Sequence, residues 1–255
     1  MGNHARMEAL SEVRFPDGRT ALGLRLAAEA DLALAPQALG LASARPTIVL
    51  SGGAAGLRAG RADRLHALFA DVLCPMATAH AAAVMDGGTD AGVMRLMGRA
   101  RAVSAADFPL IGVCAEGTVH VPDQEPPRTE AAPLEPHHTH FVFVSGGRWG
   151  DESPWLARLA SALSRGVGAV TVLVNGGAIA WRDCQHSVEQ GIPVVAVAGS
   201  GRAADALAAA LEGLKTPRDA RALVTSGLVT STDLAQGLER VRQTIEAALT
   251  STQRT

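Results

Sequence analysis

The chain has 255 residues, of which 47% are hydrophobic, and a formal net charge of −2. This length and apolar content suffice for one large α/β domain with a buried core. The basic residues, all arginines except Lys215, are scattered along the sequence. That distribution argues against a nucleic-acid binder, because such proteins gather basic side chains on one face.

Three cysteines, Cys74, Cys114 and Cys184, are an odd number without a CxxC pair. This pattern argues against a disulfide framework and a zinc site, and it fits a reducing cytoplasm. The N-terminus has no apolar core of signal-peptide length, and no stretch approaches the apolar length of a membrane span. We therefore expect a soluble cytoplasmic protein with no metal, no cofactor and no membrane contact.

Apolar strand-like runs alternate with helix-period stretches in the first half of the chain. Residues 81–101 show the plan: a strand, the pair Gly87-Gly88, then a helix with Thr89 or Asp90 expected as its N-cap. Residues 118–137 are rich in proline and acidic, and they predict a loop or flap rather than a helix or strand. Further strands are expected over 19–27, 46–53 and 109–117, and a helix over 57–73.

The second half repeats this alternation of strands and helices, and no linker divides the chain. Buried strands alternating with helices predict a parallel sheet covered on both faces. We expect one domain over 1–255, with a core over 13–212 and a C-terminal helical extension over 213–255. The expected strands are 139–147, 168–177 and 192–201, and the expected helices are 148–166, 178–191, 202–211 and 233–250.

Several of these strands end in glycine-rich turns. In an open parallel sheet the carboxyl ends of the strands share one edge, and ligands bind there. We therefore expect the glycine turns to lie together around a ligand. They are Gly52-Gly53, Gly87-Gly88, Gly146-Gly147, Gly176-Gly177 and Gly199-Ser200-Gly201.

The stretch Gly199-Ser200-Gly201-Arg202 has the parts of a phosphate cradle. Glycines admit close approach to the backbone, and the following helix offers unpaired N–H groups. The hydroxyl and the guanidinium add hydrogen bonds to an anion. The alternative is a tight turn with a solvated arginine, but a second glycine turn that carries Arg148 favours the cradle. Asp205 either holds Arg202 or belongs to the charge pattern of the helix.

Other motifs are weaker. No GxxxxGK[ST] motif occurs, and "SGGAAG" departs from GxGxxG, which lowers the case for an ordinary NAD enzyme. In "PHHTH", His138 and His140 share a strand face, and hydrogen bonding is favoured over metal binding because no further ligand is placed by spacing. Trp149, in a glycine-rich turn, is suited to stack on an adenine or to close a pocket, whereas Trp155 and Trp181 are expected in the core.

Three stretches resemble one known family: "IVLSGGAAGL", "LEPHHTHFVFVSGGRWGDES" and "VTVLVNGGAIAWRDCQHSVEQGIPVVAVAGSGRAAD". They are similar to the prokaryotic branch of the SLOG superfamily, which joins Smf/DprA DNA-processing proteins and LOG cytokinin-activating enzymes. This branch is similar to the LSDAT domain, the cytosolic N-terminal domain of melastatin-type TRP channels. The resemblance covers about residues 13–212. It implies a Rossmann-like three-layer α/β/α fold with a mainly parallel sheet, and a nucleotide-derived ligand, ADP-ribose in some channel members.

The resemblance also implies which turns face the ligand, and Trp149 joins them by its position in one of these turns. The family residues carried over are Gly52, Gly53, Ala54, Gly147, Arg148, Gly150, Glu152, Asn175, Gly176, Gly177, Gly199, Ser200, Gly201 and Arg202.

The chain departs from the LOG enzymes, which cleave a nucleotide N-glycosidic bond and carry PGGxGTxxE. Here "NGGAIAWRD" has Asn175 in place of proline, Ile179 and Ala180 in place of Gly-Thr, and Asp183 in place of glutamate. Cleavage needs a carboxylate near the oxocarbenium-like centre and a way to activate water. In an enzyme, Asp183 or Glu152 would be that acid/base, and the shorter aspartate limits the reach.

The leading hypothesis is a binding protein or sensor for an ADP-ribose-like ligand. The alternative is a LOG-like nucleotide N-glycosidic hydrolase (phosphoribohydrolase). A third hypothesis, a protein that binds single-stranded DNA, lacks the basic stripe and the several aromatics that such proteins use for stacking. A homodimer is expected only by analogy with relatives.

Overall fold

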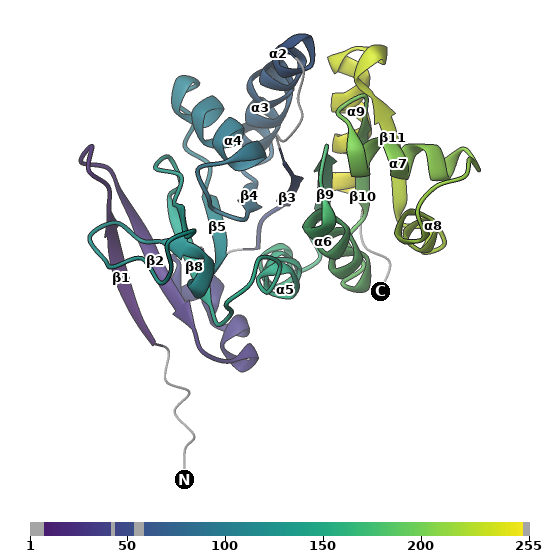
Figure 1. Ribbon diagram of the computed structural model, residues 1–255. Coiled ribbons are helices and arrows are strands. Elements are labelled where there is room, and N and C mark those ends of the chain that lie inside the picture. Colours follow the sequence, from purple (N-terminus) through teal and green to yellow (C-terminus); the bar gives the residue numbers. More distant parts are fainter. Residues whose placement is uncertain (1–7, 42–43, 54–58, 252–255) are drawn as a thin grey trace.

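Strands β3 (Thr47–Gly52) and β9 (Ala169–Val174) lie side by side within a nine-stranded sheet, in the order β1-β2-β8-β5-β4-β3-β9-β10-β11 (Figure 1). The computed structural model describes residues 8–41, 44–53 and 59–251. Strand β1 runs antiparallel to β2, and every other neighbouring pair in this sheet is parallel. The expected α/β class with a mainly parallel sheet is confirmed.

The remaining strands of the sheet are β1 (Glu8–Arg14), β2 (Thr20–Leu26), β4 (Ala83–Asp86), β5 (Leu110–Ala115), β8 (His140–Val144), β10 (Val194–Ala198) and β11 (Val229–Asp233), and β6 (Val119–His120) pairs separately with β7 (Ala132–Pro133). The helices are α1 (Ala35–Ala38), α2 (Ala59–Ala67), α3 (Cys74–Ala79), α4 (Gly92–Val103), α5 (Ser153–Ser164), α6 (Ala178–Glu189), α7 (Arg202–Leu211), α8 (Arg218–Val224) and α9 (Leu238–Thr250). Short 3-10 turns are η1 (Glu29–Ala33), η3 (Glu116–Thr118) and η4 (Leu234–Gln236), and η2 (Leu68–Leu73) is π-helical.

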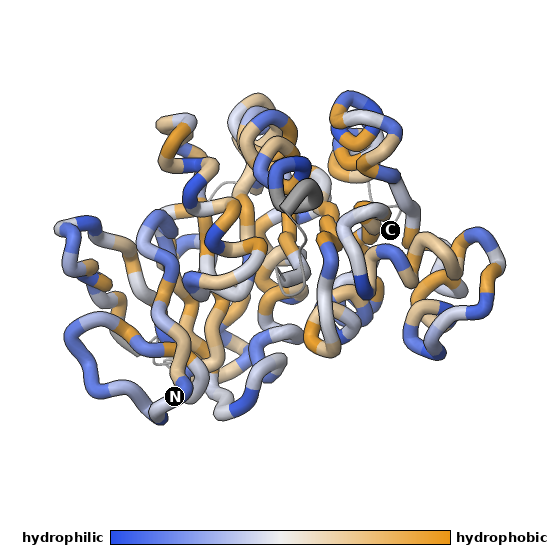
Figure 2. Tube along the Cα trace, turned by 45° about the horizontal axis from the view of Figure 1, so that its top comes forward, coloured by the Kyte–Doolittle hydropathy of each residue, from blue (hydrophilic) through white to orange (hydrophobic). Residues whose placement is uncertain are grey.

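Alternation of side chains along the strands builds two apolar layers, one on each face of the sheet. In β3, Ile48 and Leu50 pack into the layer covered by α2, α4 and α9, whereas Val49 packs into the layer that contains α5. Helices α6, α7 and α8 cover the second face beside β9 and β10. Apolar residues concentrate along the central strands and polar residues along the outer turns (Figure 2). The fold is therefore a three-layer α/β/α arrangement.

The strand order reverses direction at β3 and β9. The chain moves from β3 to β4 on one side and from β9 to β10 on the other, so their turns diverge between these two strands. Such a switch point leaves a crevice outside the carboxyl ends of the strands, which is the usual ligand position in open parallel sheets. The fold places the turns after Gly52 and Val174 on this crevice.

Four features differ from the sequence expectations. Strand β1 was not predicted, and the segment after residue 212 contains α8 and the edge strand β11 as well as the expected helix. Helix α4 begins after Ala91 instead of Thr89 or Asp90. The stretch 118–137, expected to be loop alone, contains the two-residue strands β6 and β7. Short or edge strands bury few side chains, so their sequence pattern is weak.

Candidate ligand site at the strand switch point

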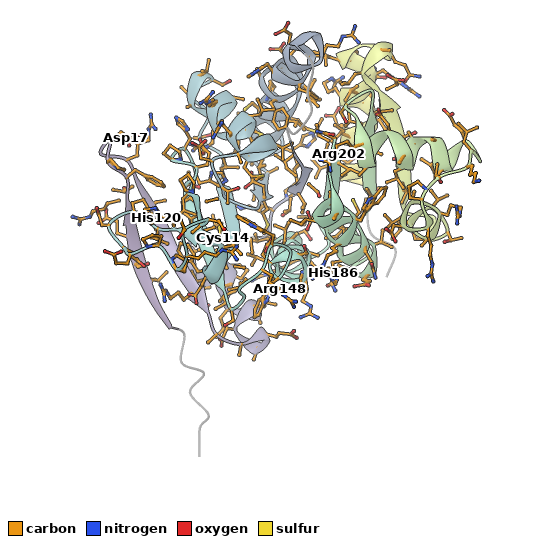
Figure 3. All side chains as sticks on the ribbon, in the orientation of Figure 1. Asp17, Cys114, His120, Arg148, His186 and Arg202 are labelled. Atoms are coloured by element: carbon orange, nitrogen blue, oxygen red, sulfur yellow. The ribbon has the colours of Figure 1, made fainter. Side chains whose placement is uncertain are left out.

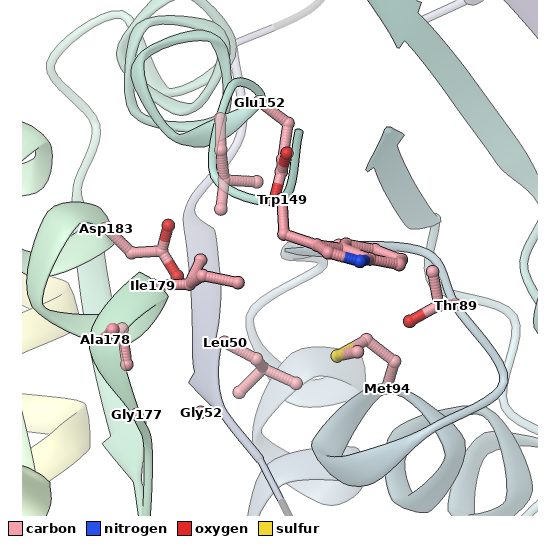
Figure 4. A pocket seen from close by; sticks show the side chains of 13 residues that line it. Leu50, Gly52, Thr89, Met94, Trp149, Glu152, Gly177, Ala178, Ile179 and Asp183 are labelled. Carbon is pink, nitrogen blue, oxygen red and sulfur yellow. The ribbon is translucent and has the colours of Figure 1, made fainter. Parts of the chain in front are cut away.

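A cavity of about 250 Å³ opens at the carboxyl edge of the sheet (Figure 4). Its walls come from the ends of β3 and β4, the start of α4, the turn before α5 and the first turns of α6. In the close view, Trp149 extends over Met94 toward Thr89, while Asp183 and Ile179 face the space from α6. The lining residues are Leu50, Gly52, Gly87, Thr89, Met94, Trp149, Glu152, Leu156, Gly177, Ala178, Ile179, Ala180 and Asp183.

The end of β3 approaches β9 so closely that residue 52 must be glycine. Its φ is +149°, and a Cβ atom there would lie 1.9 Å from the carbonyl oxygen of Val174. Beside it, Nδ2 of Asn175 donates to the carbonyl oxygen of Gly53 over 2.8 Å. These contacts fix the two turns on either side of the switch point. Ala54 lies outside the described residues.

Helix α6 points its amino end at the cavity. Gly177 is the N-cap, and no side chain of the described residues caps the helix. The first N–H groups of a helix lack intrahelical partners and carry partial positive charge. The guanidinium of Arg202 lies against the same turn, since a Cβ atom on Gly177 would be 3.0 Å from Nη2. Two sources of positive potential therefore meet beside Gly177.

The turn at 199–202 uses its own polar groups within the fold. Oδ1 of Asp205 accepts the N–H groups of Gly199 and Gly201 at 2.7 and 3.1 Å. Asp205 therefore holds the turn, and no ion pair between it and Arg202 is found in the described part of the chain. The two N–H groups that would cradle a phosphate already bind a carboxylate.

Ser200 is fully buried. Its hydroxyl donates to the carbonyl oxygen of Val197 and accepts the N–H of Asn175 at 2.7 Å. The side chain thus joins the turn after β10 to the turn after β9 and has no group directed at a ligand. Of the four residues expected to form the cradle, only Arg202 reaches the neighbourhood of the cavity.

The turn before α5 is held in the same way. Oδ2 of Asp151 accepts the N–H groups of Gly147 and Arg148 at 3.1 and 3.0 Å. Arg148 is exposed and does not line the cavity, in contrast to Trp149 and Glu152 of the same turn. Figure 3 shows Arg148 beside α5, well apart from Arg202. The two arginines expected to act together on an anion do not face the same space.

Two carboxyl groups line the cavity, and burial raises the pKa of both. Asp183 accepts hydrogen bonds from the hydroxyls of Ser51 and Ser153 at 2.7 and 2.5 Å, which only partly offset the effect of burial on its pKa. Glu152 accepts the N–H of Gly150, and the nearby charge of Asp183 adds to the effect of burial on its pKa. Paired carboxyls with raised pKa values are typical of sites that transfer protons, although structural networks also produce them.

Six residues of the expected glycine turns and acid/base pair therefore line one cavity: Gly52, Gly87, Trp149, Glu152, Gly177 and Asp183. Gly53, Asn175, Gly176 and Arg202 lie in the adjoining turns, whereas Gly147, Arg148, Gly150, Gly199, Ser200 and Gly201 do not line it. The sequence reasoning missed the apolar wall, which consists chiefly of Leu50, Met94, Leu156 and Ile179. Hydrophobic periodicity assigns such residues to the core and cannot separate a core side chain from one that lines a cavity.

A second polar cluster lies beneath the sheet edge. His138 is buried and sits between Oδ1 of Asp86 and Oε2 of Glu135, each 2.9 Å from a ring nitrogen. Burial by itself lowers the pKa of His138, but the two carboxylates outweigh it and raise the pKa to about 9. Among the described residues, no group of three or more His, Cys, Asp or Glu is arranged to hold a metal ion. The histidine therefore serves as a buried ionic link.

Comparisons with known proteins identify the family and the fold. A family model described as SLOG in TRPM, prokaryote, matches residues 45–243, so the match begins and ends later than the range 13–212 expected from the motifs. Transient receptor potential cation channel subfamily M member 2 of Rattus norvegicus is 27% identical over 180 residues, and that of Mus musculus is 28% identical over 184 residues. Each match covers 57% of this chain and 12% of the channel.

The chain thus spans only 12% of the length of these curated relatives. Among solved structures, the X-ray structure of TM1055, a structural genomics target, aligns over 78% of this chain and 98% of that chain. The TM-score is 0.50 and the sequence identity 20%, which shows a likeness of fold. No helix in the described part of the chain combines the length and the apolar character that crossing a membrane requires.

Proposed function

This chain belongs to the family described as SLOG in TRPM, prokaryote, and from that premise we propose that its cavity binds a nucleotide-derived ligand of the ADP-ribose kind. The fold and family suggest either binding of a nucleotide-related ligand or a LOG-like activity. We favour binding, in which the protein acts as a sensor or binding protein for the ligand.

The observation that carries the proposal is the meeting of the α6 amino end and Arg202 at Gly177, on the rim of the cavity. A phosphate there would accept hydrogen bonds from uncapped N–H groups and from a guanidinium whose planar fork matches phosphate oxygens. Gly177 carries no Cβ, so a ligand can approach this turn and the guanidinium of Arg202 closely. The phosphate contacts proposed here are the residues at 52–53 and 176–178 together with Arg202.

The other walls suit the remaining parts of a nucleotide. Trp149 and Met94 offer apolar surfaces on which a base can stack, and Leu50 extends this surface inward. The carboxyls of Asp183 and Glu152 can accept hydrogen bonds from ribose hydroxyls. A cavity of about 250 Å³ lies near the lower end of the sizes typical of small-molecule pockets, so a ligand as long as ADP-ribose would extend beyond it.

The alternative is a LOG-like hydrolase of a nucleotide N-glycosidic bond, and the pair of carboxyls favours it. Asp183 and Glu152 line the same cavity, and burial raises the pKa of each, which favours the protonated form that a general acid needs. Such a pair can protonate a leaving base and activate water. The hydroxyls of Ser51 and Ser153 fix both oxygens of Asp183, which suits a positioned carboxylate.

One experiment separates the two functions. ADP-ribose, AMP and NAD are each titrated into the protein by calorimetry, and the same mixtures are then incubated and analysed by chromatography for free base or ribose phosphate. Tight binding with unchanged ligand supports the sensor. Release of base that is lost in Asp183→Asn supports the hydrolase. Absence of both binding and turnover with all three nucleotides would refute the nucleotide proposal.

We further propose a cytoplasmic protein that forms a homodimer, by analogy with relatives alone. Light scattering after size-exclusion chromatography tests the dimer, since a mass equal to that of one chain at micromolar concentration would contradict it.

A further inference from the structure

Loop 121–131, between β6 and β7, brings Arg128 onto the ring of Trp149. The guanidinium carbon of Arg128 lies 5.9 Å from the ring centroid, within the range of a cation–π interaction. Nη1 of the same arginine donates to the carbonyl oxygen of Gly147 over 3.0 Å. One side chain of the loop therefore contacts both the ring and the turn that carries the ring.

Arg128 is half-buried, and part of its side chain packs against the protein. Its Nε is buried and has no hydrogen-bond partner within the described ranges, whereas residues 123–127 of the same loop are exposed. Leaving a buried donor unpaired is unfavourable, so the contacts to Trp149 and Gly147 must outweigh it. Arg128 therefore anchors its part of the loop to the turn that carries Trp149.

Trp149 needs such an anchor because the hydrogen bonds of its turn hold the backbone and not the ring. The side chain lines the cavity, yet 40% of its surface is exposed. The N–H groups of Gly147 and Gly150 bind Asp151 and Glu152, and these bonds fix the backbone without touching the indole ring. Ordering a mobile side chain when a ligand binds weakens affinity, and holding it in place beforehand strengthens affinity.

We propose that Arg128 is a positioning residue that holds the Trp149 ring in the cavity wall, so that loop 121–131 controls how long a nucleotide base stays bound. The positioning concerns this chain alone, and the effect on retention rests on the proposed function. Arg128 does not line the cavity among the described residues, so it acts through the tryptophan.

The first test needs no ligand. The chain has three tryptophans, so a protein labelled with 5-fluorotryptophan gives three ¹⁹F signals, and the signal missing in Trp149→Phe is that of Trp149. We expect Arg128→Ala to shift this signal toward its position in unfolded protein and leave the other two in place. In Arg128→Lys the Trp149 signal should shift less than in Arg128→Ala, because an ammonium can still donate to the carbonyl oxygen of Gly147. Glu130→Ala, an exposed change in the same loop, is the matched control and should change nothing.

The second test measures retention with AMP and ADP-ribose as probes. Stopped-flow displacement should show release about five- to tenfold faster in Arg128→Ala than in the unaltered protein, with similar association rates. Arg128→Lys should lie between the two, and Glu130→Ala should match the unaltered protein. A melting temperature unchanged in Arg128→Ala excludes general unfolding as the cause.

The outcomes separate the two proposals. An unmoved Trp149 signal in Arg128→Ala would overturn the positioning role whatever the nucleotides do. A moved signal with unaltered release of AMP and ADP-ribose would overturn the control of retention. A moved signal in a protein that binds neither nucleotide would support the positioning role and refute the proposed function.

Discussion

The hydroxyl of Ser51 donates a hydrogen bond to Oδ2 of Asp183 over 2.7 Å, although 132 positions separate the two residues in the chain. The bond joins the end of β3 to the second turn of α6 across the switch point. It orients a carboxyl group in the cavity wall whose burial raises its pKa. Burial of such a carboxyl lowers the stability of the fold, so a role in a ligand site explains its position better than a structural role does.

Asp183→Asn should therefore stabilise the protein at neutral pH. When a carboxyl has a higher pKa in the folded protein than in the unfolded chain, the folded protein loses stability as the pH rises from the unfolded pKa to the folded pKa. The loss is about 1.4 kcal/mol for each unit of that rise. An amide cannot ionise, so the advantage of Asp183→Asn in unfolding free energy should be greatest at neutral pH and shrink toward pH 4. Urea unfolding at several pH values measures it.

The control for this prediction is Asp71→Asn, which changes an exposed aspartate outside the cavity lining. Its unfolding free energy should stay within about 0.5 kcal/mol of that of the unaltered protein, because the side chain is exposed. A stability advantage of Asp183→Asn that does not depend on pH would contradict the assignment of a raised pKa.

Arg202→Ala should weaken the binding of AMP and ADP-ribose about tenfold or more, because a charge-assisted hydrogen bond contributes roughly 1.5–3 kcal/mol. Arg148→Ala is the matched control and should change affinity less than about twofold, since Arg148 is exposed and outside the cavity lining. Calorimetric titration measures both. Equal losses in the two variants would show that the phosphate also contacts the turn before α5.

Gly52→Ala should destabilise the protein by at least about 2 kcal/mol, because it combines a φ of +149° with a Cβ 1.9 Å from the carbonyl oxygen of Val174. Gly53→Ala is the control from the next position, where a Cβ meets no atom within 4 Å. Thermal unfolding compares the two variants. A Gly52→Ala protein that melts like Gly53→Ala would show that β3 and β9 can move apart.

His138 should make stability fall on the alkaline side of neutrality. Its pKa is raised to about 9 by Asp86 and Glu135 against the effect of burial. The stabilisation is complete below the unfolded pKa of roughly 6.5 and is lost as the pH rises through the folded value. Within that window the unfolding free energy should fall by at most about 1.4 kcal/mol per pH unit.

Urea unfolding between pH 6 and pH 9.5 measures this slope. In His138→Gln the slope should disappear, and the protein should also be less stable at pH 7, because Asp86 and Glu135 lose their buried partner. An unaltered slope in that variant would assign the pH dependence to other groups.

The fold could be predicted from the sequence because its central strands are continuous apolar runs between glycine turns. Strands such as β9 and β10 are buried on both faces, so every residue in them carries the signal. Edge strand β11 has exposed residues at its centre and reads as polar loop. Strand β1 lies at the other edge and pairs only with β2.

The sequence predicts the candidate site less completely, because glycine and arginine patterns do not show which N–H donors remain free to bind a ligand. The sequence leaves the role of Asp205 open between a pair with Arg202 and a helix charge, and the structure gives it to the N–H groups of Gly199 and Gly201. That bond depends on the path of the turn in space, which local spacing does not determine. The contacts of Ser51 with Asp183 and of Arg128 with Trp149 join distant segments and have no local signal.

Asp151 and Asp205 give two of these turns a built-in counter-ion. Without these carboxylates, the adjacent N–H groups of each turn would repel one another unless an anion from solution bound them. Here a carboxylate of the same chain accepts their hydrogen bonds. These bonds therefore hold both turns in shape without an outside anion. The backbones of crystal structures determined with and without nucleotide should superimpose along residues 146–151 and 199–205.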